Sequence, residues 1–303
     1  MTVVPHTPVT HQRKPDWIRS KLPAAGNLVQ KFQDRLQTPL ATVCQEANCP
    51  NQGECWNSGT ATFMLMGDFC TRACRFCAVK TAKTPPPLDD KEADKLVTSL
   101  ENLKLKYVVL TTVDRDDLED QGAAHIGHCI ETIRKRLPEI IVEILIPDFQ
   151  GQERALRTVI QSGPHVIGHN LECTRNLTRT VRDPRAGYDQ SLAVLEKIKL
   201  LSSSIYTKSS LMLGFGETEA EVLEAMQDLR SVKTDFLTLG QYLQPNQTKL
   251  PVHEYIPPEK FEWFKEKGLA LGFGYVASGP LVRSSYKAAE HFISAQIGQD
   301  KEE

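Results

Sequence analysis

The chain has 303 residues, of which 40% are hydrophobic and 24% are charged, and its formal net charge is -2. This length suits one large domain or two small ones with a sizeable core. The near-balanced charge gives no sign of a nucleic acid or an anionic membrane as the main partner, and no apolar run approaches the roughly 20 residues that span a bilayer. Because the N-terminus lacks an apolar signal-type stretch, we expect a cytoplasmic protein, with a processed organellar one as the alternative.

After residue 60 the chain alternates apolar, strand-like runs with amphipathic helical patterns, in which apolar positions recur every three or four residues. We predict strands at Phe63–Met66, Tyr107–Thr111, Ile141–Ile146, His165–Gly168, Ser209–Leu213 and Phe236–Leu239. We predict helices at Asp89–Leu103, Ala123–Leu137, Gln152–Gln161, Tyr188–Leu201, Glu219–Arg230 and around Pro258–Lys267. Short buried strands alternating with such helices indicate a parallel sheet of the α/β class.

Six strand–helix units predict a partial (β/α)6 TIM-like barrel over residues 61–243. Residues 1–60 are then an N-terminal extension and residues 244–303 a C-terminal extension. A doubly wound open sheet is the alternative, since hydrophobic periodicity does not distinguish the two.

Polar motifs follow the predicted strands directly. They are Asp68–Cys77, Thr112–Asp117, His169–Glu172, Gly214–Glu217 and the pair Gln241 and Gln244. Active sites of parallel α/β proteins form at the C-terminal ends of the strands. The sequence therefore predicts that these motifs meet in one site.

The eight cysteines are unevenly distributed. Six lie between Cys44 and Cys77, whereas Cys129 and Cys173 stand alone and are expected to be packed thiols. Disulfides are rare in a reducing cytoplasm, so a dense cysteine group in a large chain favours a metal centre or catalysis.

Cys70, Cys74 and Cys77 have the spacing C-x3-C-x2-C. Three thiolates can hold three irons of a 4Fe–4S cluster and leave the fourth iron open to a substrate or cofactor. Zinc is the alternative, because C-x2-C is half of a zinc ribbon, but no second C-x2-C follows Cys77. Phe76 would add an aromatic wall beside a bound cofactor. The spacing resembles the motif of the radical S-adenosylmethionine superfamily.

That resemblance implies that the open iron binds S-adenosylmethionine and that an electron from the cluster cleaves it to a 5′-deoxyadenosyl radical. The same superfamily uses a partial (β/α)6 barrel. Candidates for binding the ammonium group or ribose hydroxyls of the cofactor follow the second and fourth strands, namely Thr112, Asp114, Asn170 and Glu172. A solvated turn is the alternative for each.

Three further features have a plainer interpretation. Gly214–Glu217 could approach the cofactor closely through its backbone, or could be an ordinary strand-to-helix turn. Arg182 and Arg185 are expected to form a surface salt-bridge face, rather than to bind a carboxylate or an acidic partner. His125, His128 and His253 show no metal-ligand spacing and are expected to be structural.

Cys44, Cys49 and Cys55 form another triad with the spacing C-x4-C-x5-C. The surrounding residues, Gln45-Glu-Ala-Asn-Cys-Pro-Asn-Gln-Gly-Glu-Cys, have the composition of a loop. A loop with three thiols can enclose a metal centre and donate backbone hydrogen bonds to cluster sulfurs. A zinc knuckle or a set of core thiols is the alternative.

The combined pattern resembles the lipoyl synthase family, from about Lys14 to Ala289. The matching motifs are Lys14-Pro-Asp-Trp-Ile, Glu46-Ala-Asn-Cys-Pro-Asn, Met66-Gly-Asp-x-Cys-Thr-Arg-x-Cys-Arg-Phe-Cys, Val113-Asp-Arg-Asp-Asp-Leu, His169-Asn-Leu-Glu, Met212-Leu-Gly-Phe-Gly-Glu-Thr and Arg283-Ser-Ser-Tyr. The triad before the barrel and the terminal Arg-Ser-Ser-Tyr discriminate best.

The resemblance implies insertion of two sulfur atoms at carbons 6 and 8 of an octanoyl chain, which is held as an amide on a carrier-protein lysine. The carriers are lipoyl domains of 2-oxoacid dehydrogenases and the glycine-cleavage H protein, and the electron donor is a protein such as ferredoxin or flavodoxin. Cys44, Cys49 and Cys55 would hold an auxiliary 4Fe–4S cluster that donates the sulfur. Ser285, with Ser284 as the alternative, would bind the fourth iron of that cluster.

Two other functions compete with this interpretation. Biotin synthase is another sulfur-inserting radical enzyme, but it needs neither the triad before the barrel nor the terminal Arg-Ser-Ser-Tyr. A non-catalytic iron–sulfur or zinc protein that senses redox state is the alternative from a different class. Such a sensor would form no 5′-deoxyadenosine.

Overall fold

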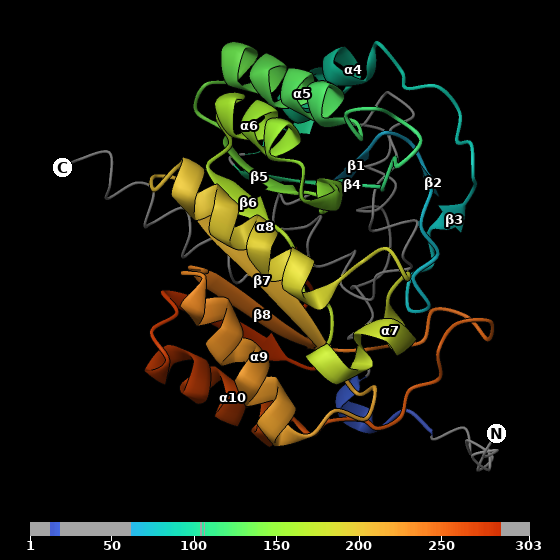
Figure 1. Cartoon of the computed structure of the whole chain (residues 1–303), viewed down its shortest axis with the longest axis vertical. Coiled ribbons are helices and arrows are strands. Elements are labelled where there is room, and N and C mark those ends of the chain that lie inside the picture. Colours follow the sequence, from blue (N-terminus) through green and yellow to red (C-terminus); the bar gives the residue numbers. More distant parts are fainter. Residues whose placement is uncertain (1–12, 19–61, 104, 106, 286–303) are drawn as a thin grey trace.

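The computed structural model describes residues 13–18, 62–103, 105 and 107–285 (Figure 1). Seven parallel strands form one sheet in the order β1-β4-β5-β6-β7-β8-β9. The strands are β1 Thr62–Leu65, β4 Tyr107–Thr112, β5 Ile141–Leu145, β6 Val166–Gly168, β7 Tyr206–Leu213, β8 Phe236–Gln241 and β9 Tyr275–Gly279. All six predicted strands are confirmed, and the sheet gains β9 from the predicted C-terminal extension.

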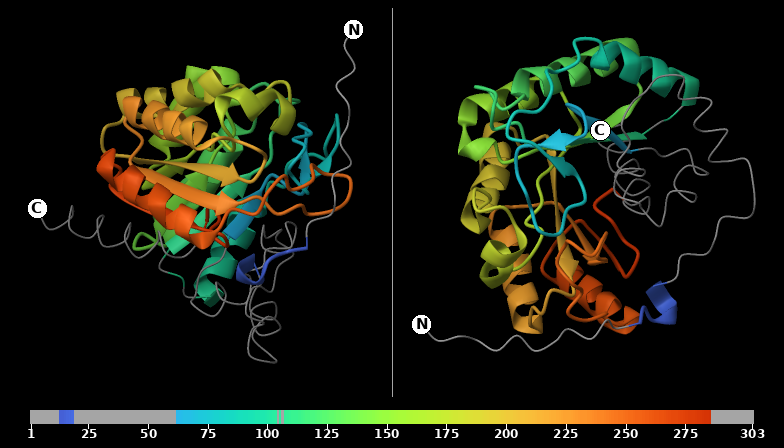
Figure 2. Two further views of the ribbon diagram at one scale, coloured as in Figure 1. Left: turned by 90° about the horizontal axis from the view of Figure 1, so that it is seen from below. Right: turned by 90° about the vertical axis from the view of Figure 1, so that its right-hand side faces the viewer.

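The predicted helices are also confirmed. They are α4 Glu92–Leu103, α5 Ala123–Arg136, α6 Glu153–Gln161, α8 Tyr188–Leu201, α9 Glu219–Ser231 and α10 Pro258–Ala270. Their apolar faces pack on the outside of the curved sheet, where Leu96, Ile130 and Phe264 are among the buried residues (Figure 2). Burial of such side chains is the main favourable contribution to the fold.

The order of the strands distinguishes the predicted partial barrel from the alternative, a doubly wound sheet. The strands follow one another across the sheet in sequence order, so right-handed crossovers place every helix on the same side. A doubly wound sheet would instead reverse its strand order partway. Among the described residues no pairing joins β1 to β9. The partial TIM-like barrel is therefore confirmed, and the doubly wound alternative is wrong.

Four short elements lie beyond the C-terminal ends of the barrel strands. The strands β2 Phe69–Cys70 and β3 Lys80–Thr81 pair with each other in a small parallel sheet of their own. The 3-10 helix η3 Arg175–Leu177 leads into α7 Thr178–Val181.

None of the described helices combines the length and the apolar composition that crossing a bilayer would require.

Candidate active site

The loop that contains Cys70, Cys74 and Cys77, residues 66–81, leaves the C-terminal end of β1 and is held by hydrogen bonds from the rest of the barrel. The amide of Cys77 donates to the carbonyl of Cys74 at 3.2 Å, which forms a tight turn between these two ligand candidates. The amide of Asp114 donates to the Cys70 sulfur at 3.3 Å, and the amide of Asp183 donates to the Cys74 sulfur at 3.3 Å. Such N–H donors also stabilise cluster-bound thiolates.

The geometry of the triad favours a cluster over a single metal ion. Among the described residues, the group compact enough for one ion, with ligand atoms within 4.8 Å of one another, is Glu92, His125 and Cys129, and not this triad. Sulfurs around one zinc ion lie only about 3.8 Å apart, given bonds near 2.3 Å. Burial raises the pKa of Cys70 and of Cys74 to about 12, so a strong positive charge is needed to ionise both thiols. The irons of a bound cluster would supply that charge, as a zinc ion would, so the spacing of the sulfurs and not their pKa favours the cluster.

Arg72, between the first two cysteines, anchors this loop to the barrel. Its side chain is only 3% exposed and forms paired hydrogen bonds with Asp148 at 2.7 Å and 2.7 Å. It also donates to Asp116 at 2.8 Å and lies 3.3 Å from Asp114. Burial opposes ionisation of Asp116, but hydrogen bonds from Arg72, Thr71 and Gln150 and the charge of Arg72 together outweigh it and hold the pKa of that carboxyl below its usual range. The guanidinium therefore joins the loop to the ends of both β4 and β5.

We predict that Arg72→Met destabilises the metal-free protein by about 3–5 kcal/mol, because the buried carboxylate of Asp148 loses its charge partner and Asp116 keeps only its ion pair with Arg185. Arg72→Lys should fall between wild type and Arg72→Met, since an ammonium cannot form the paired contacts. Denaturant titration measures both changes. The control is Arg157→Met, because Arg157 is 53% exposed and pairs with Glu153 one helical turn away; such a pair contributes about 0.3–0.5 kcal/mol. Equal effects at positions 72 and 157 would contradict the anchoring role.

A cavity of about 850 Å³ opens beside the triad. Its lining includes every predicted site residue that the structure describes, namely Cys70, Cys74, Cys77, Phe76, Thr112, Asp114, Asn170, Glu172 and Ser285. Ser284 also contributes to this lining. A cavity of this volume is within the usual range for cofactor and substrate pockets.

Hydrogen bonds within the protein hold the polar side chains of the cavity lining in place. The Thr112 hydroxyl donates to the carbonyl of Leu145 at 3.1 Å, and the Asn170 amide donates to Glu172 at 3.1 Å. Burial raises the pKa of Asp114 to about 6, so this carboxyl is mostly ionised at pH 7 and can accept hydrogen bonds from an ammonium group. Burial also raises the pKa of Glu172. These oxygens suit the ammonium and hydroxyl groups expected of S-adenosylmethionine.

The two ends of the described chain meet at this cavity. Lys14, which precedes the 3-10 helix η1 Asp16–Ile18, and Ile18, the last residue of that helix, line it from the N-terminal side. Val282 and Arg283 line it together with the two serines from the C-terminal side. The other triad, Cys44, Cys49 and Cys55, lies outside the described residues.

Comparison with known proteins agrees with this geometry. Residues 64–229 match the model of the radical SAM superfamily. A lipoyl synthase from Anaeromyxobacter sp. (strain Fw109-5) is 54% identical over 286 residues, which cover 94% of this chain and 97% of that protein. The chain belongs to the lipoyl synthase family. It is accordingly a radical SAM enzyme of the sulfur-inserting class.

Other relatives extend this similarity across kingdoms and compartments. A mitochondrial lipoyl synthase from Branchiostoma floridae is 49% identical, covering 96% of this chain and 79% of that protein. Among solved structures, the FeFe-hydrogenase maturase HydG from Carboxydothermus hydrogenoformans has a TM-score of 0.54 at 11% identity, covering 89% of this chain and 78% of that one. At this identity the likeness shows the fold alone.

The structure corrects the interpretation of Arg182 and decides between the two interpretations of the Gly214–Glu217 segment. Arg182 does not lie on a surface salt-bridge face, because it is buried, lines the cavity and donates to Ser191 at 2.9 Å. Arg185 does form the expected ion pairs, with Asp183 and Asp116. The Gly214–Glu217 segment is absent from the lining of the cavity and forms the turn before α9. Sequence spacing could not show which arginine points inward.

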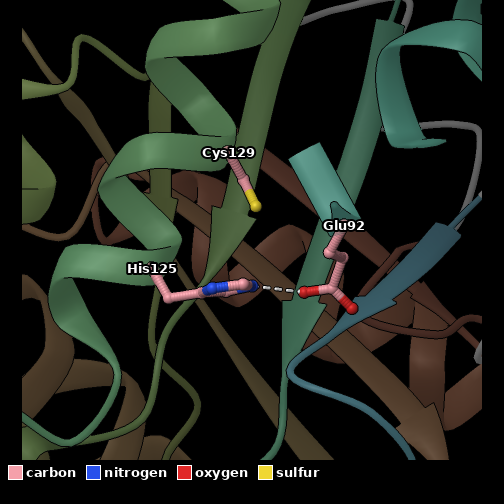
Figure 3. Close-up of side chains that lie close together, drawn as sticks. All are labelled: Glu92, His125 and Cys129. Atoms are coloured by element: carbon pink, nitrogen blue, oxygen red, sulfur yellow. Dashed lines mark hydrogen bonds and ion pairs between the residues drawn. The ribbon is translucent and has the colours of Figure 1, made fainter. Parts of the chain in front are cut away.

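The lone cysteines are buried, as predicted, but Cys129 has polar neighbours that the sequence did not reveal. Figure 3 shows Cys129 and His125, one helical turn apart on α5, facing Glu92 at the start of α4. His125 Nε2 lies 2.6 Å from Glu92 Oε2, which also accepts the amide of Met66 at 3.0 Å. Since this oxygen is already hydrogen-bonded twice, the group is an internal hydrogen-bond network that holds Met66, the first residue of the cysteine loop.

Proposed function

We propose that this enzyme inserts two sulfur atoms at carbons 6 and 8 of a protein-bound octanoyl-lysine and so produces the lipoyl cofactor. The observation that supports this most directly is that Cys70, Cys74 and Cys77 share one cavity with Ser284 and Ser285 from the other end of the chain. The residues of the radical site and the residues proposed to hold the sulfur donor thus face the same space.

A 4Fe–4S cluster on the triad, together with S-adenosylmethionine, supplies when bound the one-electron chemistry that unactivated methylene C–H bonds require. The chain's own part is to bind and orient. Asp114 would accept hydrogen bonds from the ammonium group, while Asn170 and Glu172 would bind hydroxyls. Apolar residues that line the same cavity, including Met64 and Leu211, would exclude water from the reacting carbon.

Mass spectrometry of an octanoylated carrier peptide after anaerobic turnover tests this function. The peptide should gain two sulfur atoms, and 5′-deoxyadenosine should accumulate with it. Deoxyadenosine without any thiolated peptide would contradict the proposal. Sulfur insertion into a free small molecule in place of the carrier would favour the biotin synthase alternative.

We also propose that Cys44, Cys49 and Cys55 hold an auxiliary 4Fe–4S cluster and that Ser285 binds its fourth iron. A serine oxygen is a harder ligand than thiolate and holds its iron less firmly, which suits a cluster that gives up sulfur. Family membership is what supports proposing the second cluster, the lipoyl-domain and H-protein carriers, and a ferredoxin- or flavodoxin-type electron donor for this enzyme. The cytoplasmic location stays a prediction.

Ser285→Ala is expected to retain most of the iron but to lose the second sulfur insertion more than cofactor cleavage. Ser285→Cys should bind the auxiliary cluster more tightly and release its sulfur less readily, because thiolate is the softer ligand. Iron analysis and product masses measure both effects. Ser284→Ala is the matched control; if it alone stops sulfur insertion, Ser284 and not Ser285 is the ligand.

A further inference from the structure

The segment after β9, residues 280–285, turns back across the end of β8. The amide of Val282 donates to the carbonyl of Gly279 at 3.0 Å, which closes the turn. Arg283 then donates to the carbonyl of Gln241, in β8, at 3.2 Å. This path places Ser284 and Ser285 in the lining of the cavity that contains the cysteine triad.

Gly240, in β8, lies directly beneath this crossing. A Cβ atom at position 240 would lie 2.1 Å from the carbonyl oxygen of Val282 and 3.1 Å from its carbonyl carbon. Both are backbone atoms, so no side-chain rotation can relieve the overlap. The segment can therefore approach β8 this closely only because residue 240 has no side chain.

The end of β8 is fixed, so the crossing segment is the part that would have to move. Gly240 is paired with Met212 of β7 on one side and with Gly279 of β9 on the other. The next residue is also held, because Gln241 Nε2 donates to the carbonyl of Leu213 at 3.0 Å and Gln241 Oε1 accepts the amide of Ile256 at 2.8 Å. Displacing β8 would break several of these hydrogen bonds together.

We propose that Gly240 is a positioning residue that seats the C-terminal serines at the cavity. A methyl group at position 240 would lift the segment and move Ser284 and Ser285 away from the cysteine triad, while the residues of the radical site stay in place. The sulfur-insertion consequence rests on the proposed function. The displacement of the segment does not.

Hydrogen exchange of the full-length, cluster-free protein tests whether residues 280–285 are held against the end of β8. Among the amides of residues 281–285, that of Val282 donates to the carbonyl of Gly279, and in Gly240→Ala it should exchange at least about tenfold faster than in wild type, because overpacking displaces the segment that carries it. Gly274→Ala is the matched control, because a Cβ there meets its nearest atom, in the Phe236 ring, at an ordinary 3.5 Å. Unchanged exchange at 281–285 in a folded Gly240→Ala protein would overturn the proposal.

The reconstituted enzyme gives the second measurement. Gly240→Ala should cleave S-adenosylmethionine at a rate within about twofold of wild type but form at least about tenfold less dithiolated product. General destabilisation would instead lower both activities together. Equal loss of both activities would overturn the positioning role. If wild type itself yields no thiolated product, the proposed function fails, yet the exchange result still decides whether Gly240 seats the segment.

Arg283→Ala provides a test that leaves β8 intact, in case Gly240→Ala does not fold. It removes the donors to the carbonyls of Gln241 and Val282. We expect the Val282 amide to exchange faster than in wild type, by a smaller factor than in Gly240→Ala. Exchange as slow as in wild type would count against seating of the segment on β8.

Discussion

Replacing Cys70, Cys74 and Cys77 together by alanine is expected to abolish cleavage of S-adenosylmethionine and to lower the iron content from about eight to about four per chain, as two cubanes would predict. The reason is that these three thiols are the cysteines that line the cavity in the described part of the chain. Iron analysis after anaerobic reconstitution and chromatographic assay of 5′-deoxyadenosine measure the two effects.

The two lone cysteines supply the control for this experiment. Cys129 and Cys173 are buried and absent from the cavity lining, so Cys129→Ala and Cys173→Ala should keep both the iron and the cleavage activity. Continued cleavage by the triple variant at positions 70, 74 and 77 would disprove the assignment of the radical site.

The second large effect is expected at the other triad. Replacing Cys44, Cys49 and Cys55 by alanine should again lower the iron to about four per chain, but it should spare cleavage of S-adenosylmethionine, because that reaction needs only one cubane. Sulfur insertion should stop, since the proposed donor is missing. The product masses of an octanoylated peptide, measured beside 5′-deoxyadenosine, separate the two outcomes.

The triple variant at positions 44, 49 and 55 and the Gly240→Ala variant should differ in their content of auxiliary iron. Loss of the thiols should remove the auxiliary iron, whereas displacement of Ser285 should leave most of it bound. If thiolated peptide still accumulates without Cys44, Cys49 and Cys55, the sulfur comes from a different source and the auxiliary-cluster proposal is wrong.

The sequence by itself determined the features that depend on local pattern. Buried β-branched runs and amphipathic periodicities located six strands and six helices, because side chains repeat every two residues in a strand and every 3.6 in a helix. The spacing of Cys70, Cys74 and Cys77 predicted the radical site, and the structure places all three thiols in the lining of one cavity. The rule that motifs after parallel strands converge placed Thr112, Asp114, Asn170 and Glu172 together, and all four line one cavity.

Only the tertiary structure decided the features that depend on contacts between distant residues. Arg72 and Asp148 are 76 positions apart, and nothing in the motif around either residue shows that they form a buried pair. β9 was missed because it is a five-residue strand, without amphipathic alternation, in a segment interpreted as an extension. Gly240 resembles any other strand glycine until Val282 is seen to cross it. Local sequence specifies which elements form, but the close approach of two backbones depends on how those elements pack, and so it could be known only from the folded chain.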